Sequence, residues 1–260
     1  MTEVKAKKFL GQHFLTDENI ALRIVESLSA SSQKVIEIGP GMGVLTKYLI
    51  TRSNTELHVV EIDHESVAYL HNHYPTLDVI EGDFLKLDLN TLFHDSFAII
   101  GNFPYNISSQ ILFKVFDYRD HVSEVVGMFQ KEVAERVAAG PGSKTYGILS
   151  VLLSAFYKTE YLFTVNENVF SPPPKVKSAV IRLIRNNVTN LDCDEKLFVQ
   201  VVKAGFNQRR KTLRNALRQL GMSLEGVPEE MLAKRAEQLS TDDFIIITKV
   251  IESCQWYRIL

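Results

Sequence analysis

The 260-residue sequence has few of the residues that build cross-linked or membrane-spanning proteins. Its 2 cysteines, Cys193 and Cys254, are too few for a disulfide framework or a four-cysteine zinc site. No apolar run reaches about 18 residues, the length that predicts a membrane-spanning helix. The N-terminal stretch lacks the long apolar core and small-residue cleavage pattern of a secretion signal. We therefore expect a reducing, cytoplasmic location.

The composition is that of an ordinary globular protein, with 45% hydrophobic and 23% charged residues. These fractions exclude a mainly disordered, collagen-like or low-complexity chain. The length suggests one large domain, or one large and one small domain. The net charge is only -2, but residues 168–191 and 196–224 contain lysine and arginine and no acidic residue. A nearly neutral chain of this kind can still carry a basic face.

Four short runs of β-branched and apolar residues, each bounded by Gly, Asp or Asn, predict buried parallel strands. They cover residues 34–39, 57–63, 78–83 and 97–102. Segments of helical length separate them, which predicts an α/β fold with a doubly wound, Rossmann-like sheet. Later strand-like segments bring the expected number to about seven. Only helical patterns follow the polar stretch 185–195, so we expect a sheet domain, 1–187, and a small all-helical domain, 188–260.

A glycine-rich turn follows the first predicted strand, with Gly39, Gly41 and Gly43 at alternate positions. Glycines at this place let a ligand approach the carboxyl end of the strand. The sixth position of the dinucleotide fingerprint is Val44 rather than glycine, and no P-loop motif is present. The run from Glu37 to Gly43 instead resembles motif I of the S-adenosylmethionine-dependent methyltransferases. A glycine-rich turn without a ligand is the alternative.

Two acidic residues stand where the next two predicted strands end. Glu61 lies 20 residues after Gly41, where a carboxylate can accept both hydrogen bonds of a ribose diol. Asp83 could accept a hydrogen bond from an adenine amino group, with Phe84 alongside the ring. Either acid alone often only caps a helix. Together with the glycines, at the ends of three strands, they predict one nucleoside-shaped pocket.

The fourth strand ends in Asn102-Phe103-Pro104-Tyr105, which resembles the [DNS]-P-P-[YF] motif of methyltransferases that modify amino nitrogens. An adenine amine is a poor nucleophile because its lone pair is delocalised into the ring. The side-chain oxygen of Asn102 and a backbone carbonyl can accept its two N–H bonds, which draws the nitrogen toward a tetrahedral shape. Pro104 stiffens the loop, and Tyr105 offers a face for a flipped-out base. An ordinary Asn/Pro turn is the alternative.

Several longer motifs make the resemblance specific. They are KFLGQHFL from residue 8, EIGPGMGVLT from 37, NFPYNIS from 102, QKEV from 130, GSKTYG from 142, FSPPPKV from 170 and AGFNQRRKTLRN from 204. Together they are similar to the small-subunit ribosomal RNA adenine dimethyltransferases, a family with a class I methyltransferase fold. In the bacterial form, this resemblance implies dimethylation of two adjacent adenosines in a 3′-terminal hairpin of 16S RNA. Four methyl groups would come from four molecules of S-adenosylmethionine, in a substrate that is a 30S subunit or its precursor.

The resemblance also implies roles for individual residues. The cofactor residues would be His13, Leu15, Gly39, Gly41, Glu61, Ile62, Asp83, Phe84 and Asn102. The catalytic residues would be Asn102, Pro104, Tyr105 and Phe170. Phe170 would be the second stacking face, opposite Tyr105, although a core phenylalanine is the alternative. The segment GQHFL would fold over the cofactor as a lid, with His13 where many relatives have asparagine. Phe103 replaces the more usual leucine.

A basic stretch, 203–218, is predicted as a helix that contacts the RNA backbone. The residues assigned to RNA are Lys175, Lys177, Lys203, Arg209, Arg210, Lys211 and Arg214. Phosphate contacts of this kind position a substrate without reading its sequence. In another context, such a helix is usually a solvated face. We expect a monomer, no metal and no membrane.

Three other functions fit parts of the sequence. A 23S RNA adenine methyltransferase of the antibiotic-resistance type shares the glycine motif and the NxPY motif. A non-catalytic RNA-binding or transcription factor could have the same fold, but Gly39, Glu61, Asp83 and Asn102 are intact. A small-molecule methyltransferase would have no use for a basic helical annex. The segments GSKTYG and FNQRRKTLRN favour the small-subunit enzyme.

Overall fold

The computed structural model of the chain describes residues 4–219 and 221–256. The chain divides into two compact units. The first, here called the sheet unit, runs up to Ala134 and resumes with Thr159–Arg185. The second, the helical unit, comprises Glu135–Lys158 and the chain from Asn186 onward. The second unit thus includes Glu135–Lys158, a segment that the expected division after residue 187 assigns to the sheet domain.

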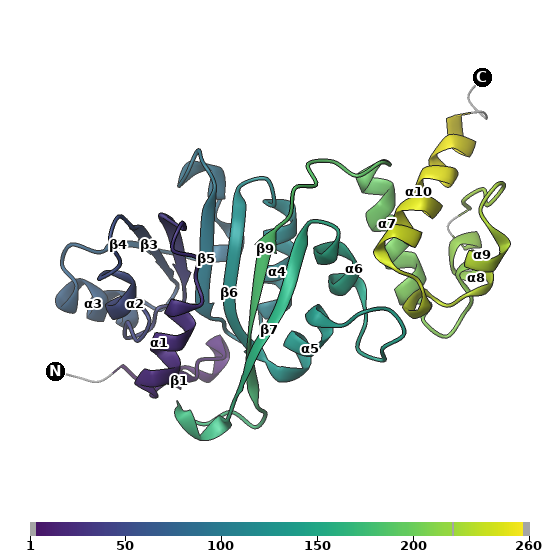
Figure 1. Cartoon of the computed structure of the whole chain (residues 1–260). Helices are drawn as coiled ribbons and strands as arrows, with labels where there is room; N and C mark the ends of the chain where they lie inside the picture. Colours follow the sequence, from purple (N-terminus) through teal and green to yellow (C-terminus); the bar gives the residue numbers. More distant parts are fainter. Residues whose placement is uncertain (1–3, 220, 257–260) are drawn as a thin grey trace. The chain divides into compact units, whose positions relative to one another are not determined.

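The sheet unit is built on seven strands in the order β4-β3-β2-β5-β6-β9-β7 (Figure 1). They are β2 Lys34–Ile38, β3 Glu56–Glu61, β4 Asp78–Glu81, β5 Phe97–Asn102, β6 Val122–Gln130, β7 Tyr157–Val165 and β9 Ser178–Arg185. The strands from β4 to β6 pair in parallel, and β9 is antiparallel to β6. The predicted α/β fold is therefore confirmed. The order reverses between β2 and β5, which is where ligands bind in doubly wound sheets.

The central strands β2, β5, β6 and β9 are buried on both faces, as expected for strands covered on both sides of a doubly wound sheet. On one face, Val35, Ala98, Ile100 and Val126 pack with helix α1 (Glu18–Glu26) and helix α2 (Thr46–Leu49). Their sequence neighbours point to the opposite face because side chains alternate along a strand. Helix α3 (His64–His73) follows β3, helix α4 (Ser108–Asp117) follows β5, and helix α5 (Lys131–Ala138) follows β6.

The N-terminal segment runs beside a stretch from the other end of the sheet unit. A 3₁₀ turn, η1 (Lys8–Leu10), leads into the two-residue strand β1 (Phe14–Leu15). Strand β1 pairs antiparallel with β8 (Phe170–Ser171), and Leu15 stands opposite Phe170 in the register. Asp17 then caps α1 by accepting a hydrogen bond from the Ile20 amide at 3.0 Å. The small β1-β8 sheet joins the two motifs GQHFL and FSPPP.

The C-terminal part of the helical unit is entirely helical, as predicted. Its elements are α7 Glu195–Asn207, α8 Leu213–Arg218, α9 Glu229–Ala233, the turn η5 Ala236–Gln238 and α10 Thr241–Trp256. The earlier segment of this unit, Glu135–Lys158, contains α6 Ile148–Ser154. The prediction of one continuous basic helix over 203–218 is wrong. Helix α7 ends before Gln208, and the Lys211 amide donates to the Gln208 carbonyl at 2.7 Å in a tight turn. Lys203 and Arg214 consequently lie on different helices.

Candidate functional site

A cavity opens where β2, β3, β4 and β5 end, next to the switch point of the sheet. Its walls are the turns after these four strands and the N-terminal segment from Leu10 to Phe14. The predicted residues that line it are His13, Gly39, Gly41, Glu61, Ile62, Asp83, Phe84, Asn102, Pro104 and Tyr105. All of them belong to the sheet unit. Residues from five separate parts of the sequence therefore meet at one cavity.

Two predicted residues do not line this cavity. Leu15 and Phe170 are each only 4% exposed and belong to the hydrophobic core beneath β1 and β8. Leu15 borders a neighbouring hollow that Glu37 also lines. The structure thus places Phe170 as a core phenylalanine, the alternative to a stacking face beside Tyr105.

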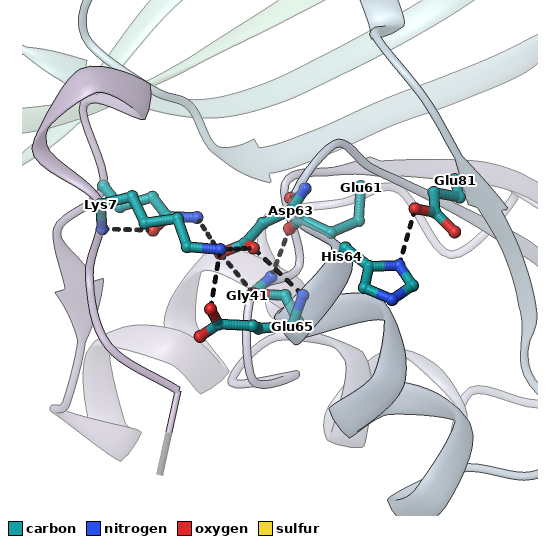
Figure 2. A network of polar contacts seen from close by, with 9 residues as sticks. Lys7, Gly41, Glu61, Asp63, His64, Glu65 and Glu81 are labelled. Atoms are coloured by element: carbon teal, nitrogen blue, oxygen red, sulfur yellow. Dashed lines mark hydrogen bonds and ion pairs between the residues drawn. The ribbon is translucent and has the colours of Figure 1, made fainter. Parts of the chain in front are cut away.

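Glu61 is held by two backbone amides from different turns. Gly41 donates to Oε2 at 3.0 Å, and Asp63 donates to Oε1 at 2.8 Å (Figure 2). Burial raises the pKa of the Glu61 carboxyl, and these N–H bonds counteract that rise. Each carboxylate oxygen has a second lone pair, so both can still accept a hydroxyl group. Gly41 has φ +57°, and a Cβ atom there would lie 2.9 Å from the Phe14 ring. Glycine is therefore needed for this close approach.

Asp83 caps a turn and also lines the cavity. Its Oδ1 accepts the Leu85 amide at 3.0 Å, capping the turn η2 (Phe84–Lys86), while the residue lines the cavity. Beside it, Ile62 is 51% exposed although it is apolar. Ile62 and Phe84 give the cavity apolar walls next to one carboxylate. That combination suits a flat, partly polar group such as a purine.

Asn102 is oriented by the N-terminal segment. Its Nδ2 donates to the His13 carbonyl at 2.9 Å, which leaves Oδ1 as an acceptor at the cavity. The His13 ring lies 5.4 Å from the Tyr105 ring, tilted by 33°, and Nδ1 is 2.7 Å from the Pro172 carbonyl. The Tyr105 hydroxyl bonds Ser178 Oγ at 2.5 Å. Burial raises the pKa of Tyr105 above the ordinary value of a phenol.

Phe103 forms part of the cavity wall from within the core. It is 1% exposed, and its ring meets Phe129 edge-on at a centroid distance of 4.9 Å. The ring packs against Gly101 and Gly127, where no side chain competes for the space. Two neighbouring glycines thus make room for the Phe103 ring.

Sequence reasoning missed several residues that support the site. Lys114 of α4 is buried and donates to three backbone carbonyls of the segment that carries Asp83. Lys7 and Gln12 bind the Asp63 carboxylate beside Glu61. The signal for Lys114 is a lysine among buried apolar positions of a helix. No local signal identifies the partner of Lys7, because Asp63 lies 56 residues away.

Glu37, in the glycine motif, is buried behind the cavity. Its Oε2 accepts a hydrogen bond from Thr46 Oγ1 at 2.6 Å. Burial raises the pKa of Glu37 to about 8, an effect to which the nearby Glu61 adds. At neutral pH this carboxyl is therefore mainly protonated, and it is an uncharged part of the wall of the neighbouring hollow.

Some basic side chains of the helical unit are already bonded to other residues, and others are not. Arg209 donates to the Lys144 carbonyl at 2.6 Å and lies 3.8 Å from a Glu237 carboxylate oxygen. Arg214 is ion-paired with Glu229. Arg210 and Lys211 are exposed, and their side chains have no hydrogen-bond or ion-pair partner among residues 4–219 and 221–256. Lys203 is also exposed, as are Lys175 and Lys177 of the sheet unit. Arg210 and Lys211 are thus the residues of this turn best placed to meet phosphate.

Two classes of site are not found in the described part of the chain. No group of three or more His, Cys, Asp or Glu residues there could hold a metal ion. No helix in that part is long and apolar enough to cross a membrane.

The sequence matches characterised proteins over nearly its whole length. Residues 3–252 match the family described as ribosomal RNA adenine dimethylase. A protein of Cytophaga hutchinsonii named ribosomal RNA small subunit methyltransferase A is 61% identical over 255 residues, covering 96% of this chain and 99% of the relative. A Flavobacterium johnsoniae protein of the same name is 57% identical over 257 residues, covering 97% and 98%.

Solved structures agree with this similarity. A dimethyladenosine transferase from Plasmodium falciparum matches with a TM-score of 0.73 and 27% identity, covering 90% of this chain and 96% of that one. The 23S rRNA methyltransferase ErmE matches with a TM-score of 0.67 and 24% identity, covering 90% and 99%. At that identity the second match shows a shared fold only.

Proposed function

The chain belongs to the ribosomal RNA adenine dimethylase family, and from that premise we propose that it dimethylates N6 of two adjacent adenosines in a 3′-terminal hairpin of 16S rRNA. The methyl donor is S-adenosylmethionine. One observation carries the proposal: a single cavity brings Glu61 and Asp83, suited to a nucleoside, next to Asn102 and Tyr105, suited to a target base. The residues suited to the methyl donor and those suited to the target amine thus line the same cavity.

The side chains that line the cavity have the chemistry needed to bind this cofactor. Glu61 offers two fixed carboxylate oxygens for a ribose diol, and Asp83 offers Oδ2 to an adenine amine between Ile62 and Phe84. The turn at Gly39 and Gly41 leaves the backbone open toward the methionine portion. When bound, the cofactor supplies an electrophilic methyl group on a sulfonium. The residues of this chain hold it and exclude water with the segment from Leu10 to Phe14.

Asn102 and Tyr105 would prepare the amine. Asn102 Oδ1 accepts one N–H bond of the adenine amine, and its Nδ2 is already fixed by the His13 carbonyl. The Tyr105 ring offers a stacking face, and its hydroxyl is anchored on Ser178. Such stacking contributes roughly 1–3 kcal/mol without reading the sequence. The proton leaves after methyl transfer, so no dedicated base is required.

The helical unit would bind the RNA backbone, with Arg210 and Lys211 exposed for phosphate contacts. Lys203 on α7, with Lys175 and Lys177 on the sheet unit, would add positive charge. The single chain supplies every residue that the proposal assigns to the cofactor and the target amine, and a monomer is the working unit we propose. The ribosomal substrate places the reaction in the cytoplasm, on the 30S subunit or its precursor.

The similarity to small-subunit methyltransferases favours this substrate over 23S rRNA. Transfer of labelled methyl groups to unmethylated 30S particles, with 50S particles in parallel, tests the choice. We expect N6,N6-dimethyladenosine in 30S only. Label confined to 50S would establish the 23S alternative. Cofactor binding without label in either particle would indicate a binding protein that has lost its chemistry.

A further inference from the structure

The N-terminal segment is tied to the end of β3 by a buried carboxylate. Residues 7–14, here called the strap, supply two donors to Asp63, whose side chain is fully buried (Figure 2). Lys7 Nζ lies 2.5 Å from Oδ1, and Gln12 Nε2 lies 3.0 Å from Oδ2. The Glu65 amide donates to the same carboxylate at 3.1 Å, as the cap of α3. Asp63 thus joins the strap to the start of a helix.

The same residue also touches the cofactor pocket. The Asp63 backbone amide donates to Glu61 Oε1, the carboxylate assigned to the ribose. Only one residue separates Asp63 from Glu61, so a displacement of Asp63 would move a donor of Glu61. The strap and Glu61, the proposed ribose acceptor, are therefore coupled through Asp63, whose carboxylate binds the strap and whose backbone amide binds Glu61.

The strap is anchored on the opposite wall as well. The His13 carbonyl accepts the Asn102 side chain at 2.9 Å. Gly11 lies so close to Asn106 that an added Cβ atom would be 2.8 Å from the Asn106 amide oxygen. Between these two anchorages, residues of the strap from Leu10 onward line the cavity. The strap consequently bridges the cavity from β3 to the turn after β5.

We propose that Lys7 is a positioning residue for the cofactor, whose ion pair with Asp63 latches the strap over the pocket and sets how fast the cofactor leaves. This inference rests on the proposed function, because the ligand beneath the strap is S-adenosylmethionine or its demethylated product. Dimethylation of one base needs two donors in succession. The latch must therefore open between the two transfers.

The electrostatics support a latch of intermediate strength. Burial opposes the charge of Asp63, yet the bonds from Lys7, Gln12 and the Glu65 amide lower its pKa overall. The hydrogen bond to Asp63 raises the pKa of Lys7. The Lys7 side chain is 27% exposed, so salt can weaken the pair. Lys7 also lies 3.2 Å from a carboxylate oxygen of Glu65, on the solvent side.

Lys8 offers a matched control. It is the next residue in the strap, has the same charge, is exposed, and has no ion-pair partner among the described residues. Lys7→Met and Lys8→Met therefore remove the same charge from the same segment. Lys7→Arg restores the positive charge at the latch.

The test measures dissociation of S-adenosylhomocysteine from the full chain by stopped-flow displacement, with affinity by calorimetry. We expect Lys7→Met to raise the dissociation rate roughly tenfold with little change in the association rate. Lys8→Met should match the wild type, and Lys7→Arg should stay within about twofold of it. Rising NaCl should speed dissociation from the wild type more than from Lys7→Met.

A second readout needs no ligand. The Leu10 and Gly11 amides donate within the strap to Lys7 and Lys8 carbonyls, at 3.1 and 3.0 Å. Hydrogen exchange at these amides should accelerate in Lys7→Met and not in Lys8→Met. Equal dissociation rates for the two methionine variants would overturn the latch while leaving the proposed function intact. If the wild type binds no S-adenosylhomocysteine, the proposed function fails, and the latch fails with it.

Discussion

The ammonium group of Lys114 lies 2.7 Å from the backbone carbonyl oxygen of Phe84, inside the protein. The same group donates to the carbonyl of Leu85 at 3.2 Å and to that of Leu87. Burial lowers the pKa of Lys114, although the acids around it favour its charge. One side chain from α4 thereby fixes the turn that presents Asp83 to the cavity.

Lys114→Met should loosen this turn and weaken recognition of adenine. We expect the affinity for S-adenosylhomocysteine to fall roughly tenfold, because a buried, charge-assisted set of hydrogen bonds is lost. The inosine analogue lacks the amino group that Asp83 would accept, so its affinity should fall less. Calorimetry with both ligands gives the ratio of the two affinities, and we expect Lys114→Met to lower this preference for adenine.

Lys86→Met is the control for that experiment. Lys86 is on the same turn, but its side chain is 85% exposed. Its ammonium group lies 3.9 Å from an Asp83 carboxylate oxygen, which is too far for a hydrogen bond. It should leave the preference for adenine unchanged. An unaltered adenine preference in Lys114→Met would show that the turn holds its shape without the lysine.

Most of the sheet was predictable because its signals are local. Runs such as 34–39 and 97–102 are short, rich in β-branched and apolar residues, and bounded by Gly, Asp or Asn, which marks buried parallel strands. Glu61 and Asp83 stand at the carboxyl ends of such runs, so predicting that they meet near Gly39 required only the parallel order of the strands. The expected segments of helical length between these runs contain α2 and α3, and the helical patterns after residue 195 contain α7 and α10.

Tertiary partners were not predictable in the same way. Arg209 and Arg214 look like free cations, and their acceptors Lys144 and Glu229 become neighbours only through folding. The basic stretch has helical spacing throughout, so periodicity could not show that α7 ends before Gln208. Long-range pairing, rather than local pattern, decides such details.

Arg210 and Lys211 should contribute most of the phosphate contacts made by the turn between α7 and α8. Replacing both with Gln should lower affinity for the rRNA hairpin and reduce the slope of log K against log salt by about 2, since each lost contact removes about 1. Filter binding across a salt series measures this slope.

Glu229→Gln, which releases Arg214, should leave the slope unchanged or steeper. An unchanged slope in the double variant would place the RNA elsewhere.

Glu37 should make stability depend on pH in an unusual direction. Its pKa is raised by burial from 4.5 to about 8, so between these values the folded chain holds a proton that the unfolded chain has released. The stabilisation is complete below the unfolded pKa and is lost as pH rises through the folded pKa. The free energy of unfolding should fall by roughly 1 kcal/mol per pH unit across that window.

Glu37→Gln keeps an uncharged acceptor for Thr46 and cannot release a proton. Urea unfolding from about pH 5 to about pH 9 should therefore show a flatter profile than the wild type. The exposed Glu26 has no partner among the described residues, and Glu26→Gln should retain the wild-type profile. Parallel curves for the wild type and Glu37→Gln would mean that Glu37 is ionised in the folded chain.

Asn102→Ala should separate chemistry from binding. The variant loses the acceptor for the target amine, so single-turnover methyl transfer should slow by roughly a hundredfold, as when one polarising group is removed from an active site. It also loses the bond to the His13 carbonyl, which is worth about 1 kcal/mol, so cofactor affinity should fall about fivefold.

Tyr105→Phe is the companion variant: it keeps the stacking ring and removes only the hydroxyl that bonds Ser178. Its rate should stay within about threefold of the wild type, because the ring rather than the hydroxyl meets the base. If Asn102→Ala transfers methyl groups as fast as Tyr105→Phe, the amine is prepared by backbone carbonyls alone, and Asn102 serves only to hold the strap.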